Sequence, residues 1–421
     1  MGKAKKSSRR APNAGYAPGA AVDASDRNDE SATGAQDYGS PVAGDFKEDD
    51  LPALTSFPIV AAGASAGGLE AFTGLLQHLP VDTGMAFVFI QHLAPHHTSM
   101  LPLLLSRTTA MPVMEVQHGM PVQPNHVYII PPNTLMRIEG GVLKLEPRPE
   151  ERGAPRPIDY FLHSLAADRK ATAIGVILSG ADSDGALGLR AIRDEGGIAI
   201  VQSESSAKYP DMPRAALAAG AVDLILSPEE MGDALARIGK HPSLMGREPR
   251  GIAVKNHTDE TQWSRIFALL RTATGVDFRG YKRGTIQRRI NRRIVLQQHQ
   301  GLEAYRSELE SNRSELLALY EDILINVTGF FRDPETFRAL EKKILPRLLH
   351  ERESGMPVRV WVPGCSTGEE AYSIAMCLVE SIPASSAPVP IQIFGTDISE
   401  RGISIARTAT YAESQVAKLS P

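Results

Sequence analysis

Between residues 57 and 237 the chain alternates short apolar runs with longer amphipathic segments. The runs are rich in β-branched residues, as buried strands are, and several of the segments between them have the apolar spacing of helices. This alternation is typical of a parallel sheet covered by helices. We therefore expect a mainly parallel, doubly wound α/β domain over residues 56–238, with strands in 57–65, 85–93, 126–133, 172–180, 198–204 and 222–227, and helices in 67–79, 157–169, 185–196 and 213–220.

Two further patterns follow. Residues 258–335 are basic and predict a small all-α domain, with helices in 263–275, 284–300 and 302–326. A helical pattern over 334–353 then leads to a strand, a glycine-containing loop, a helix and a second strand, which is typical of Rossmann-like nucleotide sites. One such unit is smaller than a usual open sheet. We therefore expect a partial Rossmann-like domain over 336–421, cut short at its end.

The composition narrows the class of protein. Residues 1–50 have almost no large apolar side chains and predict a disordered tail, and 239–257 predict a linker. A net charge of −4 gives no global sign of nucleic-acid binding. Two cysteines cannot form a disulfide framework, which favours a cytoplasmic location. No apolar run reaches the roughly 18 residues of a membrane span, so membrane insertion is not expected.

One tight turn carries a candidate nucleophile. Gly63, Ser65 and Gly67 fit the pattern G-x-S-x-G between a predicted strand and a predicted helix. Glycines beside a serine permit a sharp turn that exposes the hydroxyl, and the helix start offers N–H groups to an oxyanion. Close packing of small residues, or a cradle for a phosphate, would explain the same pattern. The motif alone does not decide between these interpretations.

Two other predicted strands end in residues that could assist Ser65. His92 ends the second strand, and Asp182 and Asp184 follow the fourth. The carboxyl ends of parallel strands meet at one edge of a sheet, where a histidine can act as base and an aspartate can orient it. Taken singly, His92 could be a surface residue, and Asp184 could cap the following helix or bind a metal. The order Ser–His–Asp differs from the Ser–Asp–His of α/β-hydrolases, which disfavours a general lipase or protease.

Six segments together resemble the catalytic domain of the CheB receptor methylesterases: GASAGGLEAF, QHLAPHHTSML, PNHVYIIPPN, PIDYFLHSLA, GVILSGADSDGALGLRAIRDEGG and YPDMPRAALAAGAVDLIL. The resemblance implies that Ser65 is the nucleophile, His92 the general base and Asp184 the residue that orients His92, without a metal. It also implies an oxyanion site near the N–H groups of Ala66 and Ala181. The implied substrate is a γ-glutamyl methyl ester on a receptor helix, hydrolysed through an acyl-enzyme. We expect the short tail to stand in the place of the receiver domain that usually precedes this catalytic domain.

The last region offers a candidate nucleotide site. Asp397 ends the second strand, where an acid can accept hydrogen bonds from ribose hydroxyls. Alternatively, Ser366, Thr367 and Glu369 cap the helix between the strands, and Asp397 is simply solvated. The residues alone leave both interpretations open.

Five segments resemble the CheR receptor glutamate O-methyltransferases, which use S-adenosylmethionine: DFRGYKRGTIQRRINRRI, EAYRSEL, ILINVTGFFRDPETF, PGCSTGEEAYSIAM and FGTDISERGISIAR. The resemblance implies cofactor contacts from Asn326, Thr328, Arg332, Glu369 and Asp397, with the Arg332 guanidinium on the methionine carboxylate. The basic run 282–293 usually indicates a solvated helix face. In this family it implies docking to the acidic helical bundle of methyl-accepting chemotaxis receptors. No aromatic residues interleave it, so nucleic acid is not expected.

Together these features predict a cytoplasmic, multifunctional chemotaxis-type enzyme: a CheB–CheR hybrid whose methyltransferase half ends before the family's final strands. The alternative is a signalling scaffold in which that half only docks receptors or partners such as histidine kinase signalling proteins.

Overall fold

The computed structural model describes part of the chain in detail. It covers residues 57–92, 100–148, 156–220, 222–242, 244, 257–324, 328–351, 355–382, 389–411, 413–416 and 419. All of these belong to one compact unit, Pro52–Pro421. The predicted tail 1–50 and most of the predicted linker lie outside the described residues, as does Asn326.

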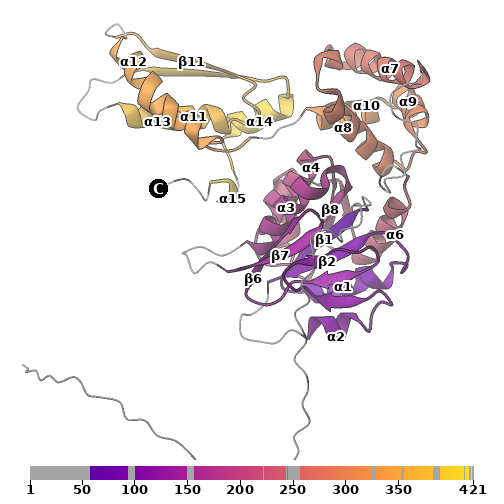
Figure 1. Cartoon of the computed structure of the whole chain (residues 1–421). Helices are drawn as coiled ribbons and strands as arrows, with labels where there is room; N and C mark the ends of the chain where they lie inside the picture. Colours follow the sequence, from indigo (N-terminus) through magenta and orange to yellow (C-terminus); the bar gives the residue numbers. More distant parts are fainter. Residues whose placement is uncertain are drawn as a thin grey trace, which may run out of the picture. The chain divides into compact units, whose positions relative to one another are not determined.

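A parallel sheet of seven strands forms the centre of the first domain (Figure 1). Its order is β10–β9–β8–β1–β2–β5–β3, and every pairing is parallel. The chain leaves the central strand β1 toward β2 on one side and returns to β8 on the other, so the end of β1 is the switch point where such sheets place their sites. This confirms the predicted mainly parallel, doubly wound fold, with β1 (Ile59–Ala64), β2 (Ala86–Gln91), β3 (Val113–Glu115), β5 (Val127–Ile129), β8 (Ala173–Ile177), β9 (Ile198–Gln202) and β10 (Leu224–Leu226).

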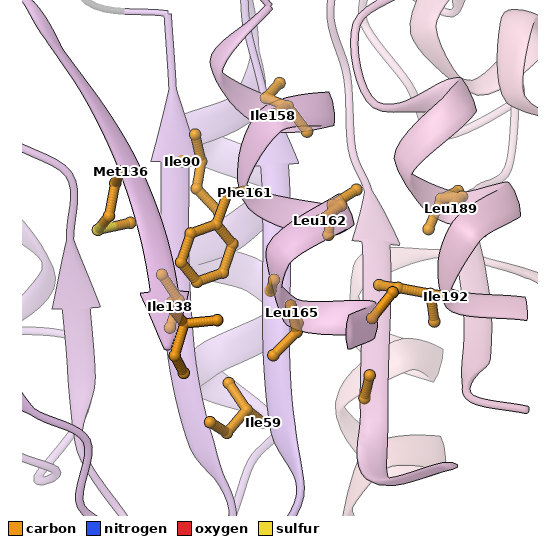
Figure 2. Close-up of a cluster of buried hydrophobic side chains, with 14 of the residues drawn as sticks. Ile59, Ile90, Met136, Ile138, Ile158, Phe161, Leu162, Leu165, Leu189 and Ile192 are labelled. Carbon is orange, nitrogen blue, oxygen red and sulfur yellow. The ribbon is translucent and has the colours of Figure 1, made fainter. Parts of the chain in front are cut away.

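Helices cover both faces of this sheet. Successive strand residues point to opposite faces, so Ile59 and Val60 enter two separate apolar cores. Ile59 packs in the core to which Phe161 and Leu165 of α3 also belong, and Figure 2 shows this helix lying across the face of the sheet. Each such fully buried side chain contributes about 1.5–3 kcal/mol of transfer free energy. The first face carries α3 (Pro157–Arg169), α4 (Ala186–Asp194) and α5 (Asp211–Ala218), and the second carries α1 (Gly68–Gln77), α2 (Leu101–Leu105) and α6 (Pro228–Gly239).

An antiparallel sheet that the pattern analysis did not predict lies beside the first core. It has the order β4–β7–β6, and Gly140 and Gly141 form its tight turn with φ of 58° and 77°. Met136, Ile138 and Leu143 direct its apolar side into the core of the first face. The glycine pair between two alternating segments is the signal that would have revealed the hairpin. Its strands are β4 (Met120–Pro121), β6 (Thr134–Glu139) and β7 (Val142–Pro147).

The second region is all-α, as predicted. Its core is formed by apolar residues from every one of its helices, among them Ile266, Ile290, Tyr305 and Leu319. The helices are α7 (His257–Thr274), α8 (Arg283–Leu296), α9 (Leu302–Ser311) and α10 (Arg313–Ile323).

The third region contains the predicted Rossmann-like unit. Strands β11 and β12 pair in parallel, with Val358 opposite Ile391. The helix predicted over 334–353 is divided by a π-helical turn, Leu340–Ile344. Pro346 follows this turn and has no N–H to continue a regular ladder. The elements are α11 (Pro334–Ala339), α12 (Leu345–His350), β11 (Val358–Pro363), α13 (Glu369–Ser381), β12 (Ile391–Thr396), α14 (Glu400–Thr408) and α15 (Glu413–Val416).

Two further features concern the whole described chain. Both cysteines, Cys365 and Cys377, are free and buried. No helix in the described ranges is both long and apolar enough to cross a membrane.

Candidate active site

Ser65 stands in the turn between β1 and α1. Its N–H donates to the carbonyl oxygen of Ser179, just after β8, at 3.0 Å. Gly67 has a left-handed φ of 76°, and a Cβ there would lie 2.7 Å from the Ser179 hydroxyl oxygen. A Cβ on Gly68 would collide with that of Ala64. Gly67 is therefore required by the close approach of the turn to Ser179, and Gly68 by its close approach to the end of β1.

Ser179 holds this turn in place. Its hydroxyl donates to the carbonyl oxygen of Ala66 at 2.8 Å and accepts from the N–H of Tyr209 at 2.9 Å. Its own N–H donates to Oε1 of Gln202 at 2.8 Å. The side chain is fully buried, so the turn is anchored by hydrogen bonds that water does not weaken. Ser179 was not among the predicted site residues, although a hydroxyl at the end of a buried strand was the available signal.

The loop after β8 also approaches the serine directly. A Cβ on Gly180 would collide with the sulfur of Met212 and lie 2.9 Å from the Cβ of Ser65. Ala66 and Ala181, on either side of this contact, are exposed. Within the described ranges, their N–H groups donate no hydrogen bond, which leaves both able to meet a ligand oxygen.

His92 follows β2, the neighbour of β1. Ala64 pairs with Gln91, and the N–H of His92 donates to the Ala64 carbonyl at 3.3 Å, so Ser65 and His92 follow directly paired strand positions. Nε2 of His92 lies 2.9 Å from Oδ2 of Asp184, and Nδ1 lies 3.0 Å from Oδ2 of Asp182. The structure therefore joins His92 to Asp184, while both ring nitrogens face carboxylates rather than the Ser65 hydroxyl.

The Asp184 carboxylate is fixed by the start of a helix. Its Oδ2 accepts the N–H of Ile158 and its Oδ1 that of Asp159, each at 2.9 Å. It therefore caps α3, not the helix that follows it in sequence, which was one interpretation of the motif. The side chain is only 3% exposed, and the helix dipole favours its negative charge.

Asp159, close to Asp184, is a further acid that was not among the predicted site residues. It accepts the N–H of Gly188 in α4 at 2.7 Å and pairs with Arg156 at 3.2 Å. Its burial and the nearby charge of Asp184 raise its pKa to about 6. Its position in the first turn of a predicted helix, where acids are favoured, was the available signal.

The two carboxylates control the charge of His92. Burial alone would lower the pKa of His92, but its hydrogen bonds to Asp182 and Asp184, together with their charges, outweigh burial and raise it to about 9. Burial would raise the pKa of Asp182, but its bonds to His92 and to the N–H of Asp184 outweigh this and lower it. At neutral pH the imidazole is therefore mostly protonated, whereas a general base must be neutral.

A cavity of about 670 Å³ lies in the region predicted to bind a cofactor. Thr328, Arg332 and Asp397 line it, so three of the predicted contacts are brought together. Asp397 is not simply solvated: its two oxygens accept the N–H groups of Ser366 and Ser399, each at 2.8 Å. The volume is in the range of small-molecule sites, about 300–1,000 Å³.

Glu369 takes a different place from the other predicted contacts. It is 1% exposed, outside the lining of this cavity, and one of its oxygens accepts from the Thr367 hydroxyl at 2.5 Å. Its other oxygen has no hydrogen-bond partner among the described residues. The next residue, Glu370, lines the cavity instead. Gly368, not Ser366 or Thr367, is the N-cap of α13, so the capping interpretation is wrong for those two residues.

The basic run on α8 is not one solvated face, which corrects that interpretation. Arg289 and Arg292 are only 4% and 3% exposed. Arg292 pairs with Asp322 of α10 at 2.6 Å, and Arg293 pairs with Glu315 of the same helix. Arg292 and Arg293 therefore turn toward carboxylates of α10 and are not directed only at solvent.

Family models match three consecutive parts of the chain. Residues 60–235 match the CheB methylesterase family. Residues 261–324 match the CheR methyltransferase, all-alpha domain, and residues 326–421 match the CheR methyltransferase, SAM binding domain.

Several curated proteins and solved structures are similar. An uncharacterized 104.1 kDa protein of Rhodobacter capsulatus is 37% identical over 334 residues, which are 75% of this chain and 35% of that protein. A Burkholderia pseudomallei (strain K96243) protein-glutamate methylesterase/protein-glutamine glutaminase 2 is 38% identical, over 42% of this chain and 52% of its own. The catalytic domain of Thermotoga maritima CheB methylesterase is 27% identical with a TM-score of 0.40, over 43% of this chain and 98% of that one.

The chain spans only part of these curated relatives, from 35% of the first to 52% of the second. The three family matches follow one another in the order of the three structural regions. The chain therefore joins a CheB methylesterase domain to the all-alpha and SAM binding domains of a CheR methyltransferase.

Proposed function

We propose that the first domain hydrolyses γ-glutamyl methyl esters on receptor helices, with Ser65 as nucleophile. The observation that carries the proposal is the contact of 2.9 Å between His92 and the buried Asp184 at the strand end beside Ser65. These residues lie at the switch point of the sheet, on the ends of three adjacent strands. A serine, a base and an orienting acid at one sheet edge are the parts that acyl transfer needs.

In this mechanism the Ser65 hydroxyl attacks the ester carbonyl while His92 takes its proton. The N–H groups of Ala66 and Ala181 stabilise the oxyanion of the tetrahedral intermediate. His92 then returns the proton to the leaving methoxide, and methanol departs from the acyl-enzyme. Water, activated by His92, releases the glutamate carboxylate and restores Ser65.

The direct test is methanol release from a receptor cytoplasmic fragment that carries radiolabelled glutamate methyl esters. We expect volatile label to appear only when the protein is added. A peptide amide and a long-chain fatty ester serve as controls for a protease and a lipase. Faster cleavage of either control than of the methylated receptor would contradict the proposed substrate class.

We further propose that the third region binds S-adenosylmethionine. The group fits the residues present: Arg332 offers a planar guanidinium to its carboxylate, and Asp397 offers acceptors to its ribose hydroxyls, around a cavity of adequate size. When bound, S-adenosylmethionine supplies the methyl group for a receptor glutamate. Thr328 contributes a further polar contact, and Asn326, outside the described residues, remains part of the proposed set. Glu369, buried outside the lining of this cavity, is the described member of the proposed set that the cavity does not include.

Asp397→Asn should weaken the binding of S-adenosylhomocysteine about tenfold, because one charge-assisted acceptor is replaced by an amide. Calorimetric titration of the full chain measures this. Glu400→Gln, at an exposed acid on the first turn of α14, is the matched control and should bind like the wild type. If the wild type itself binds no S-adenosylhomocysteine, the result supports the alternative. In that alternative this region only docks receptors or other signalling partners.

The proposed partners follow from the proposed reactions. Methyl-accepting chemotaxis receptors present glutamates on a cytoplasmic helical bundle, which implies a cytoplasmic location for this protein. Lys282 and Arg283 at the start of α8 are exposed and present positive charge to an acidic partner, although Arg283 also pairs with Glu260 at 3.3 Å. Histidine kinase signalling proteins are the second proposed class of partner.

A further inference from the structure

The proposed mechanism uses one carboxylate on His92, but the structure places two there. Nε2 of His92 contacts Asp184, the acid that the N-terminus of α3 fixes. Nδ1 is therefore the nitrogen left to take the proton of Ser65. That nitrogen is already engaged by Oδ2 of Asp182 at 3.0 Å.

We propose that Asp182 is a positioning residue that occupies Nδ1 of His92 in the resting protein and must release it before Ser65 can be activated. This inference rests on the proposed methylesterase function. The inference adds one step to the proposed mechanism. His92 is held in an unreactive arrangement until substrate or a change of pH displaces the Asp182 carboxylate.

The surroundings of the two acids explain why one is fixed and the other can leave. Asp184 is 3% exposed and holds two backbone N–H groups, whereas the Asp182 side chain is 45% exposed. Asp182 has one backbone contact, from the N–H of Asp184 to its Oδ1 at 2.6 Å. Water can replace the contact of Asp182 with His92, but it cannot reach that of Asp184.

The charged groups around the ring are predominantly acidic. From the loop after β8, Asp182 and Asp184 act directly on His92. From α3, Asp159 interacts with Asp184, and Arg156 just before that helix is the cation that acts on Asp182. Among the described residues, no other titratable group bonds to His92. Removing the charge of Asp182 therefore removes one of the two carboxylates that keep the ring protonated.

Hydrolysis should become faster as His92 loses its proton. With a pKa of about 9, roughly 1% of His92 is neutral at pH 7, and each unit by which the pKa falls raises this fraction about tenfold. Wild-type hydrolysis should therefore increase from pH 7 until it levels off above pH 9. A variant without the Asp182 charge should level off at lower pH.

Asp182→Asn tests the inference with little structural change, because the amide oxygen can still accept the N–H of Asp184. Two measurements on the full chain are needed: NMR titration of the ¹⁵N-labelled His92 ring, assigned with His92→Gln, and the pH profile of methanol release. We expect the pKa of His92 to fall by at least one unit, the profile to shift by the same amount, and hydrolysis at pH 7 to rise about tenfold. Above pH 10 the variant and wild type should be equal.

Asp211→Asn removes an exposed carboxylate of α5 as the matched control and should change neither measurement. A His92 pKa that stays near 9 in Asp182→Asn would overturn the inference. If Asp182→Asn reduced hydrolysis by the same factor at every pH, the inference would also be overturned. Asp182 would then support only the fold or the chemistry. The ring titration needs no hydrolysis, so failure of the proposed function, seen as an inactive wild type, is distinguishable from failure of this inference.

Discussion

Ser65→Ala should lower methanol release from methylated receptor by at least about a thousandfold. The substitution removes the only atom that can form the acyl-enzyme. It leaves the oxyanion donors and the binding surface in place, and these account for the small residual rate. The measurement is the initial rate of label release at pH 9, where His92 is expected to be neutral in an appreciable fraction of molecules.

The Ser65 variant should fold normally. The Ser65 hydroxyl makes no hydrogen bond within the described ranges, and alanine keeps the Cβ that packs beside Gly180. Its free energy of unfolding should therefore stay within about 0.5 kcal/mol of the wild type. Ser205→Ala, an exposed serine in the loop after β9, is the matched control. A loss of less than tenfold in Ser65→Ala would show that another group is the nucleophile.

Asp184→Asn should reduce hydrolysis by about 10⁴-fold. An amide no longer stabilises the imidazolium that forms when His92 takes the serine proton. It can also donate to Nε2, which would place the wrong tautomer against Ser65. Because the carboxylate also accepts two N–H groups of α3, the variant should lose about 1–3 kcal/mol of unfolding free energy. Denaturant unfolding and the methanol assay measure the two effects separately.

The loss of hydrolysis in Asp184→Asn must be distinguished from its loss of stability. Asp211→Asn again controls for the loss of one negative charge at the surface. If the fall in hydrolysis only matches the fraction of unfolded protein, then Asp184 serves α3 and not the reaction. A full loss of activity in folded protein agrees with the proposed role.

The element pattern was predictable because it depends on local properties. Buried strands and amphipathic helices have sequence periods of two and 3.6 residues, which can be read without tertiary contacts. The prediction failed at two places. The hairpin of β6 and β7 was missed although its glycine pair is a local signal. A single helix was expected across the π-helical turn at Leu340–Ile344, which depends on how that segment packs against its neighbours.

The candidate site was only partly predictable. The glycines around Ser65 and the strand ends that carry His92 and Asp184 place these residues at one edge of a parallel sheet. The lining of the proposed cofactor cavity was less well predicted, since Glu370 lines it and Glu369 does not. Adjacent residues of a helix point about 100° apart, so a one-residue difference depends on how the helix is rotated against the sheet.

The sequence by itself therefore determined the strand and helix order, the sharp turn at Ser65 and the sheet edge at which the acid and base collect. These follow from periodicity and from the need of tight turns for glycine. Only the tertiary structure decided that Asp184 caps α3, that Ser179 anchors the Ser65 turn and that Asp182 occupies the second nitrogen of His92. Such contacts join atoms from segments far apart in the chain, and their direction is set by packing and side-chain rotamers, which no local pattern encodes.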